Sequence, residues 1–186
     1  GALLASMQRE TERLIRLVND LLVLTRADAG ALNMHIQALD LGQLARMRCE
    51  HFAVLAARHQ VQFELTVSES YVMGDPDRLS QVLDNLLDNA LRHSPQGSVI
   101  TVEVSQNGDE GQCAVHDRGM KIPEKHLPFI FERFYRADSS RNRQTGGAGL
   151  GLAIARALIG KYAGDVAEVQ APGGIREYEI IDVRYL

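Results

Sequence analysis

The chain has 186 residues, a formal net charge of −4 at pH 7 and a hydrophobic fraction of 45%, which are the proportions of a soluble globular protein. The negative charge argues against a nucleic-acid partner, because proteins that bind phosphate backbones carry basic patches. No apolar run approaches the roughly 20 residues that a membrane-spanning helix needs. The two cysteines, Cys49 and Cys113, lack the spacing of a zinc site or a disulfide framework, so we expect both to be small, buried and free in a reducing compartment.

Residues 3–29 are predicted to form a long helix with one apolar seam. The seam residues recur alternately three and four positions apart, as in a coiled coil, and the helix is expected to end near Gly30. Because such a helix is unstable alone, we expect partner helices in a dimer or bundle, with packing on its own domain as the alternative. The chain begins inside this helical pattern, so we also expect it to be a fragment. The seam residues are Leu4, Met7, Thr11, Leu14, Val18, Leu21 and Thr25.

A linker, two helices and a strand are predicted next. Residues 31–39 have the composition of a linker, and a second helix is expected from residue 40 to about residue 59, with Asp40 as its N-cap. Residues 61–67 alternate between apolar and polar side chains, which predicts a strand. Asp75 is followed by a proline, and this pair typically begins a helix.

The rest of the chain predicts a hairpin, a loop-rich stretch, a helix and two strands. Together with the earlier elements they predict an α+β fold. We expect a two-layer α/β sandwich, in which a mixed β-sheet is covered on one face by helices, preceded by the long N-terminal helix. The predicted elements are hairpin strands at 98–106 and 112–117, a loop-rich stretch at 117–148, a helix from about Gly149 to Tyr162, and strands at 165–170 and 175–184.

The third helix, at residues 79–93, carries polar side chains beside its apolar face. On a helical wheel, Asn85, Asn89 and Arg92 line up next to the apolar arc, with His93 at its margin. This position suits a rim facing a ligand, where an amide oxygen can bind Mg²⁺ and an arginine can meet phosphate. Helix capping or simple solvation of the amides remains the alternative. The apolar arc consists of Leu79, Val82, Leu83, Leu86, Leu87 and Ala90.

Two further motifs follow this helix. Asp117 comes directly after a predicted strand and precedes Gly119, which combines an acceptor with a flexible backbone, although an ordinary turn has the same pattern. Glycines at 146–151 open an amphipathic helix, where backbone N–H groups and the helix dipole favour a polyphosphate. This segment fits neither the dinucleotide-binding nor the Walker pattern. Between the two motifs, an aromatic cluster at 129–135 leads into a polar run to residue 145, which predicts a mobile lid.

The order of these motifs resembles the catalytic, ATP-binding domain of sensor histidine kinases. This is the ATPase fold shared with DNA gyrase, MutL-type mismatch repair proteins and heat-shock chaperone ATPases. The FERFYR segment and the N-terminal helix separate the kinase branch from those relatives. The resemblance covers essentially the whole chain. It implies a partial dimerisation and phosphotransfer helix at 1–30, a linker at 31–39 and an ATP-binding catalytic domain at 40–186.

The resemblance implies a role for individual residues. Asn89 would coordinate the Mg²⁺ that bridges the phosphates of ATP, with Asn85 beside it and Arg92 near the phosphates. Asp117 would accept a hydrogen bond from the adenine amino group, and Gly119 would leave room for the nucleotide. The remaining residues expected to line the nucleotide site are His93, Lys121, Ile122, Phe131, Phe134, Tyr135, Arg136, Gly147, Gly149, Leu150, Gly151 and Leu152, the two leucines by packing rather than by contact.

The resemblance also implies partners and a location. The γ-phosphate of ATP would pass to a histidine on the phosphotransfer helix and then to an aspartate of a response regulator. The family's acceptor histidine lies in a Ser-His-Glu/Asp-Leu type of stretch, and none of the six histidines here has that context. We therefore expect no phosphoacceptor in this chain, which would act on a missing part or on a partner chain. A homodimer through the N-terminal helix and a cytoplasmic location are expected.

Two departures from the family pattern support a different hypothesis. Lys121 stands where the family favours glycine, and the C-terminal stretch lacks the usual Gly-x-Gly-Thr turn. The alternative is a degenerate module that keeps the fold for dimerisation or regulator docking without catalysis. An autonomous ATPase is disfavoured, because it would need a carboxylate to activate water. Where that carboxylate would be needed, the third helix offers the Asn85 amide. Asp88 is expected to point away from the row formed by Asn85, Asn89 and Arg92.

Overall fold

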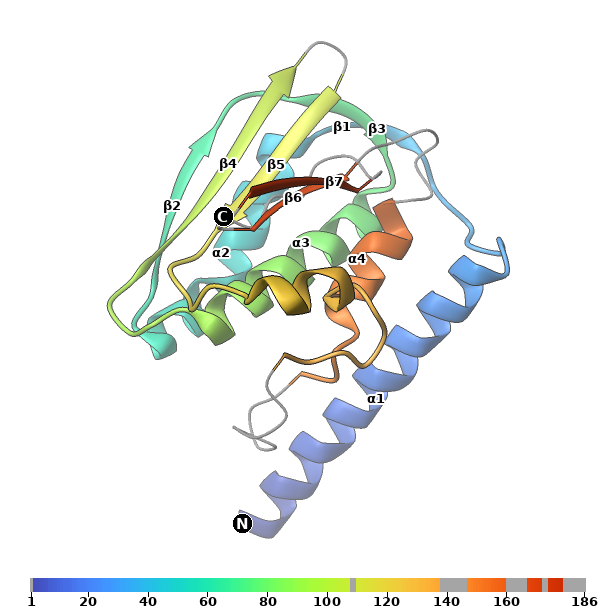
Figure 1. Cartoon of the computed structure of the whole chain (residues 1–186). Coiled ribbons are helices and arrows are strands. Elements are labelled where there is room, and N and C mark those ends of the chain that lie inside the picture. The colour runs from blue at the N-terminus through green and yellow to red at the C-terminus, as the bar shows by residue number, and fades with distance from the viewer. Residues whose placement is uncertain (1, 108–109, 138–146, 160–166, 172–173, 179–186) are drawn as a thin grey trace.

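The computed structural model describes residues 2–107, 110–137, 147–159, 167–171 and 174–178 (Figure 1). The elements in chain order are α1 (Ala2–Asp28), β1 (Gln37–Asp40), α2 (Leu41–His59), β2 (Gln62–Val67), β3 (Tyr71–Gly74), α3 (Pro76–His93), β4 (Val99–Asn107), β5 (Glu110–His116), the 3₁₀ helix η1 (Glu124–Phe129), α4 (Gly151–Ile159), β6 (Ala167–Ala171) and β7 (Gly174–Tyr178).

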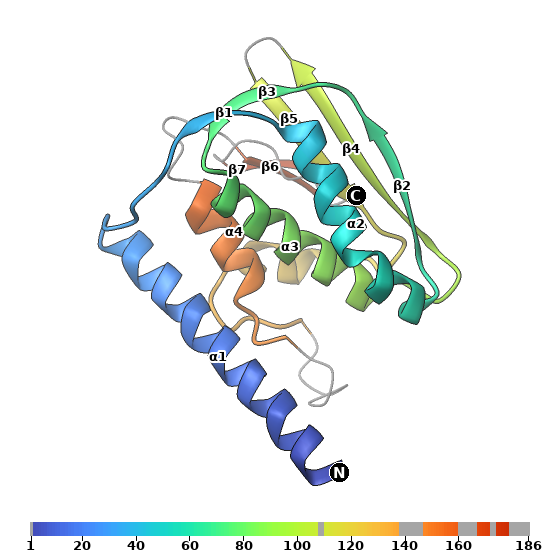
Figure 2. The same ribbon diagram turned by 180° about the vertical axis from the view of Figure 1, so that it is seen from behind.

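The central layer is a three-stranded sheet in the order β2-β4-β5, with β4 parallel to β2 and antiparallel to β5. Helices α2 and α3 cover one face of this sheet, α4 packs beside α3, and α1 lies outermost (Figure 1, Figure 2). The predicted α+β sandwich, with a mixed sheet covered on one face and a long N-terminal helix, is therefore confirmed. None of the helices in the described ranges combines the length and apolar character required to cross a membrane.

The main core forms between the sheet and α3. Along β4 the side chains of Ile100, Val102 and Val104 are buried and alternate with more exposed neighbours, as the pleat of a strand requires. The predicted apolar arc of α3 faces them, and complete burial of each leucine contributes about 1.5–3 kcal/mol. Of that arc, Leu79 is half-buried, and the buried residues of α3 are Val82, Leu83, Leu86, Leu87, Ala90 and, in addition, Leu91.

The predicted cap of α3 is present. The carboxylate of Asp75 is only 3% exposed. Its Oδ1 accepts hydrogen bonds from the backbone N–H groups of Asp77 at 3.0 Å and Arg78 at 3.2 Å, and its Oδ2 accepts from that of His35 at 2.8 Å. Burial raises the pKa of this carboxyl, but the backbone donors outweigh that effect, so the pKa lies below its usual value. One side chain thus joins the segment before β1 to the start of α3.

Helix α2 begins and ends where the sequence predicts, and an ion pair joins it to α3. The carboxylate of Asp40 accepts from the backbone N–H of Gly42 at 2.9 Å. Arg48 on α2 and Asp84 on α3 form a two-point ion pair, with Nε–Oδ1 at 2.6 Å and Nη2–Oδ2 at 2.7 Å. Paired contacts of this kind fix geometry as well as adding energy. The two helices therefore form one rigid layer over the sheet.

Several elements differ from the prediction. Strand β1 pairs antiparallel with β3, so residues 37–39 of the predicted linker belong to a small sheet. Both strands are only four residues long, too short for an alternating pattern to be recognised. The 3₁₀ helix η1 lies within the stretch predicted to be loop-rich.

The last predicted elements are partly shifted. Helix α4 begins at Gly151 rather than Gly149, because Gly149 adopts a φ of +72° that ends the preceding turn and is not helical. Strands β6 and β7 form an antiparallel pair where two strands are predicted. The predicted helix end at 160–162 and the outer parts of the two predicted strands lie outside the described residues.

Both cysteines are free, as expected. Cys49 is buried on α2 and Cys113 is half-buried on β5. Burial raises the pKa of Cys49 to about 11 and that of Cys113 to about 12. Both thiols therefore stay protonated at neutral pH and serve as small packing groups.

Candidate functional site

The predicted row of polar residues on α3, called the polar stripe below, is present and partly enclosed. Asn85 and Asn89 are half-buried one turn apart, and Arg92 is exposed one turn further on. The Nδ2 atom of Asn85 is completely buried and has no hydrogen-bond partner among the described residues. Because a buried donor without a partner costs about 1–3 kcal/mol, this amide is better explained by a ligand site than by solvation.

Two glycine-containing segments meet this stripe. A Cβ atom placed on Gly151 would lie 3.3 Å from Oδ1 of Asn85, and one placed on Gly147 would lie 3.6 Å from an Nη atom of Arg92. A Cβ placed on Gly119 would lie 2.8 Å from the carbonyl oxygen of the residue after Arg92, at the end of α3. The three predicted motifs, which are far apart in the sequence, therefore come together along one helix.

Residues 117–119 form the turn that their local sequence predicts. Oδ1 of Asp117 accepts a hydrogen bond from the backbone N–H of Gly119 at 2.6 Å, which is the usual Asx-turn contact. No described residue forms a hydrogen bond with the second carboxylate oxygen. The ordinary turn and the ligand-binding interpretation are thus compatible, because each uses a different oxygen of the same side chain.

The segment at residues 147–151, called the glycine segment below, is held by the aromatic segment at residues 129–135. Gly149 has a φ of +72°, and a Cβ added there would lie 2.7 Å from the carbonyl oxygen of Tyr135. The backbone N–H of Phe134 donates to the carbonyl oxygen of Gly149 at 2.8 Å. Phe134 itself has a φ of +63°, a strained conformation for a residue other than glycine. The close approach therefore requires a glycine at position 149.

The remaining predicted site residues are distributed between core and surface. Lys121 and Arg136 are exposed, whereas Ile122 and Phe131 pack against the core and Leu150 is buried within it. Leu152 is half-buried against the core, as expected for a packing residue. The structure thus brings the asparagines, the aspartate turn and the glycines together, while it places Lys121 and Arg136 at the surface.

Some contacts were not predicted from the sequence. Nε of Arg92 forms an ion pair with Oδ2 of Asp88 at 2.7 Å, so Asp88 lies beside the stripe rather than away from it. The spacing of four residues between these opposite charges was the signal available. The Tyr135 hydroxyl hydrogen-bonds to Nδ1 of His126 at 2.5 Å, a contact that no local pattern indicates.

The donor set fits a nucleotide that carries its own magnesium. Within the described ranges, no group of three or more His, Cys, Asp or Glu side chains could hold a metal ion. Mg²⁺ is commonly held by one or two protein oxygens together with substrate phosphates, and Asn89 would supply such an oxygen. The orphaned amide of Asn85 suits a phosphate oxygen. From residue 138 on, the predicted lid lies outside the described residues.

The comparisons with known proteins agree with this arrangement. Residues 74–181 match the family described as "Histidine kinase-, DNA gyrase B-, and HSP90-like ATPase". The chain is 39% identical to the sensor histidine kinase WalK of Bacillus subtilis over 163 residues, which are 86% of this chain and 26% of WalK. It is 38% identical to the probable sensor histidine kinase TcrY of Mycobacterium tuberculosis over 164 residues, which are 88% of this chain and 34% of TcrY. The chain thus spans about a quarter to a third of the length of these relatives.

Solved structures show the same fold. The mycobacterial sensor histidine kinase MprB superposes with a TM-score of 0.61 and 32% identity, over 70% of this chain and 84% of that one. Full-length ShkA in complex with AMPPNP superposes with a TM-score of 0.77 at 24% identity, over 97% of this chain and 36% of that one. This chain therefore belongs to the family of histidine kinase-, DNA gyrase B- and HSP90-like ATPases, and within it to the sensor histidine kinases.

Proposed function

We propose that this chain binds Mg-ATP where α3, the 117–119 turn and the 147–151 segment meet, and that it transfers the γ-phosphate to a histidine outside this chain. The phosphate then passes to an aspartate of a response regulator. The observation that carries the proposal is the convergence of Gly119, Gly147 and Gly151 on the polar stripe of α3. Both ATP and the regulator belong to the cytoplasm, where the proposal also places this chain.

The residues have separate tasks in this proposal. The Asn89 oxygen holds the metal, and the buried Asn85 amide donates to a phosphate oxygen. The second carboxylate oxygen of Asp117, which has no hydrogen-bond partner among the described residues, accepts from the adenine amino group. Asn89 would hold Mg²⁺, which would supply positive charge to offset that of the phosphate oxygens. Because phosphoryl transfer requires mainly positioning and charge neutralisation, these few polar groups are sufficient from this chain.

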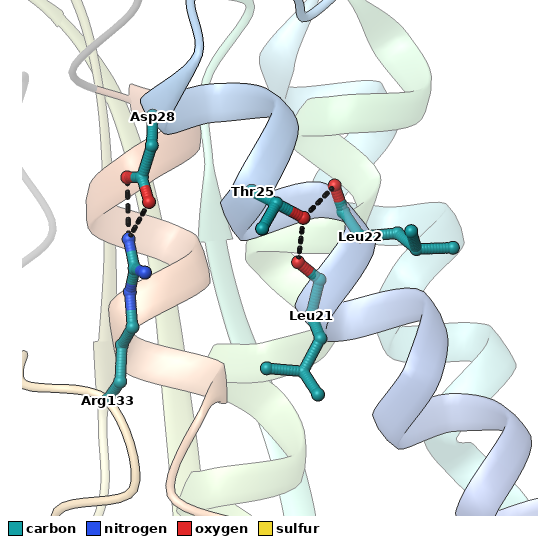
Figure 3. Close-up of polar contacts among 5 residues, drawn as sticks. All are labelled: Leu21, Leu22, Thr25, Asp28 and Arg133. Atoms are coloured by element: carbon teal, nitrogen blue, oxygen red, sulfur yellow. Dashed lines mark hydrogen bonds and ion pairs between the residues drawn. The ribbon is translucent and has the colours of Figure 1, made fainter.

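The exposed seam of α1 supports a homodimer in the same proposal. Leu14 and Val18 are 54% and 55% exposed, which is unusual for a row of apolar side chains on one helix face. The two threonines of the seam bond to their own helix. The Thr11 hydroxyl donates to the carbonyl oxygen of Met7 at 2.9 Å. The Thr25 hydroxyl donates to the carbonyl oxygen of Leu21 at 2.6 Å, as Figure 3 shows. Their hydroxyls are therefore satisfied without a partner, and their methyl groups can extend the apolar surface.

The dependence of nucleotide binding on magnesium tests the metal site. Calorimetric titration of a non-hydrolysable ATP analogue is expected to show tighter binding with Mg²⁺ than without it. In Asn89→Ala the two affinities should become nearly equal, because the protein oxygen that retains the metal is missing. Asn19→Ala, an exposed asparagine on α1, is the matched control and should keep the full magnesium effect. An unchanged magnesium effect in Asn89→Ala would contradict the assignment.

The degenerate module is the second candidate, and it is favoured by Lys121, which stands where the family favours glycine. If the nucleotide site is functional, Lys121→Gly should change the affinity for the analogue by less than about threefold. Lys121 is exposed, and surface substitutions typically change a free energy by no more than about 0.5 kcal/mol. The same titration measures this. If neither the unmodified chain nor Lys121→Gly binds at millimolar analogue, the degenerate module is the better description.

A further inference from the structure

Within the described ranges, the buried side chains of α1 lie in its C-terminal part. Leu24 and Ala27 are 1% and 3% exposed, in contrast to the exposed residues of the preceding turns. This end of α1 packs on α4, while the N-terminal part extends beyond the body of the molecule (Figure 1, Figure 2). The contact joins the long helix to the helix that follows the glycine segment.

An ion pair closes this contact. One Nη atom of Arg133 lies 2.6 Å from each carboxylate oxygen of Asp28, the last residue of α1 (Figure 3). Arg133 belongs to the aromatic segment that holds Gly149. The side chains of Arg133 and Asp28 are 43% and 54% exposed, so the pair lies at the rim of the contact rather than inside it.

An open depression lies beside the ion pair. It has a volume of about 360 Å³ and is bordered by α1, α4 and the aromatic segment, with Asp28 and Arg133 among its lining residues. Three of its lining residues are alanines, which leave space that larger side chains would fill, and the guanidinium of Arg156 lies 6.0 Å from the ring centre of Phe131. The buried Leu24 and Ala27 hold α1 on α4, and the ion pair at the rim fixes where Arg133 lies on the end of α1.

A short series of contacts leads from this ion pair to the candidate nucleotide site. The residue after Arg133 is Phe134, whose strained backbone donates to the carbonyl oxygen of Gly149 at 2.8 Å. Gly149 lies two residues before Gly151, which faces Asn85. A displacement of Arg133 would therefore also displace Phe134, which supports the glycine segment.

We propose that Asp28 and Arg133 are positioning residues, which anchor the aromatic segment on α1 and thereby hold the glycine segment in the conformation that receives nucleotide. This inference rests on the nucleotide site proposed above. By thermodynamic linkage, docking of the end of α1 and binding of nucleotide then favour one another to the same extent.

Charge reversal in the full chain tests the proposal. Asp28→Arg and Arg133→Asp should each weaken binding of the non-hydrolysable ATP analogue by about three- to fivefold, the range for a partly exposed ion pair. The double variant restores opposite charges and should bind within about twofold of the unmodified chain. Glu10 and Arg13, an exposed pair on α1 with a 3.0 Å contact, provide the control, and Glu10→Arg should leave the affinity unchanged. Thermal melts confirm that each variant is folded.

Hydrogen exchange gives an independent measurement. Adding the analogue should slow exchange of the backbone amides at residues 24–31 in the unmodified chain and not in Arg133→Asp. Unchanged affinity in both single variants, or a loss that the double variant does not restore, would overturn the proposal. If the unmodified chain binds no analogue at all, the proposed function fails as well. That outcome differs from one in which the unmodified chain and the single variants bind the analogue equally tightly.

Discussion

Asp117→Asn is expected to weaken binding of the ATP analogue by about 10- to 150-fold without unfolding the chain. The expectation follows from the two carboxylate oxygens having different tasks. Oδ1 accepts from the backbone N–H of Gly119 at 2.6 Å, and an asparagine oxygen can keep that hydrogen bond. The second oxygen becomes an NH₂ group, which would face the adenine amino group as donor against donor. Losing a hydrogen bond to a charged group costs about 1.5–3 kcal/mol, which corresponds to this range of affinities.

Two controls separate this effect from a general change in charge. Asp77→Asn removes one negative charge at an exposed position in the first turn of α3 and should leave the affinity nearly unchanged. A guanine nucleotide presents an acceptor where adenine presents its amino group, so Asp117→Asn should narrow the preference for ATP over GTP analogues. If Asp117→Asn binds the ATP analogue as tightly as the unmodified chain, this aspartate does not recognise the base.

Gly149→Ala is expected to destabilise the protein by about 3 kcal/mol or more and to abolish nucleotide binding. The alanine would have to keep a φ of +72°, which costs about 1–2 kcal/mol for a residue with a Cβ. Its Cβ would also lie 2.7 Å from the Tyr135 carbonyl oxygen and 2.8 Å from the Phe134 carbonyl carbon, and both are backbone atoms that cannot rotate away. The backbone must therefore move, and with it the hydrogen bond that Phe134 donates to this residue.

Gly30 offers a matched control for this substitution. It has a φ of +64° at the end of α1, and no atom lies within 4 Å of the position that a Cβ would take. Gly30→Ala should therefore lose only the conformational part, about 1–2 kcal/mol. Urea unfolding of both variants measures the difference. Equal losses of unfolding free energy would show that the close approach at Gly149 does not constrain the segment.

The helices were predictable because their signals are local. Asp40 and Asp75 accept hydrogen bonds from backbone groups two or three residues away, so a cap can be recognised from neighbouring residues alone. Gly30 ends α1 in the same local manner, with its N–H donating to the Ala27 carbonyl and the next N–H to that of Arg26. The apolar arc of α3 repeats every three or four residues and identifies its buried face without knowledge of the sheet.

The residues of the candidate site could be predicted from the sequence, but the contacts between them could not. Asn85, Asn89 and Asp117 stand out because amides within a helix and an aspartate after a strand need an explanation. That Asn85 lies against Gly151 depends on how α4 packs beside α3, which no single segment encodes.

The α-helices, the caps of α2 and α3, the β4–β5 hairpin and the chemically unusual residues of the site could be predicted from the sequence, because each depends on neighbours within one or two turns. The pairing of β1 with β3, the meeting of the glycines on α3 and the ion pair between Asp28 and Arg133 became visible only in the folded chain. These contacts join residues that are distant along the chain. Their formation depends on the packing of whole elements, since closing a long loop is repaid only when many contacts form together.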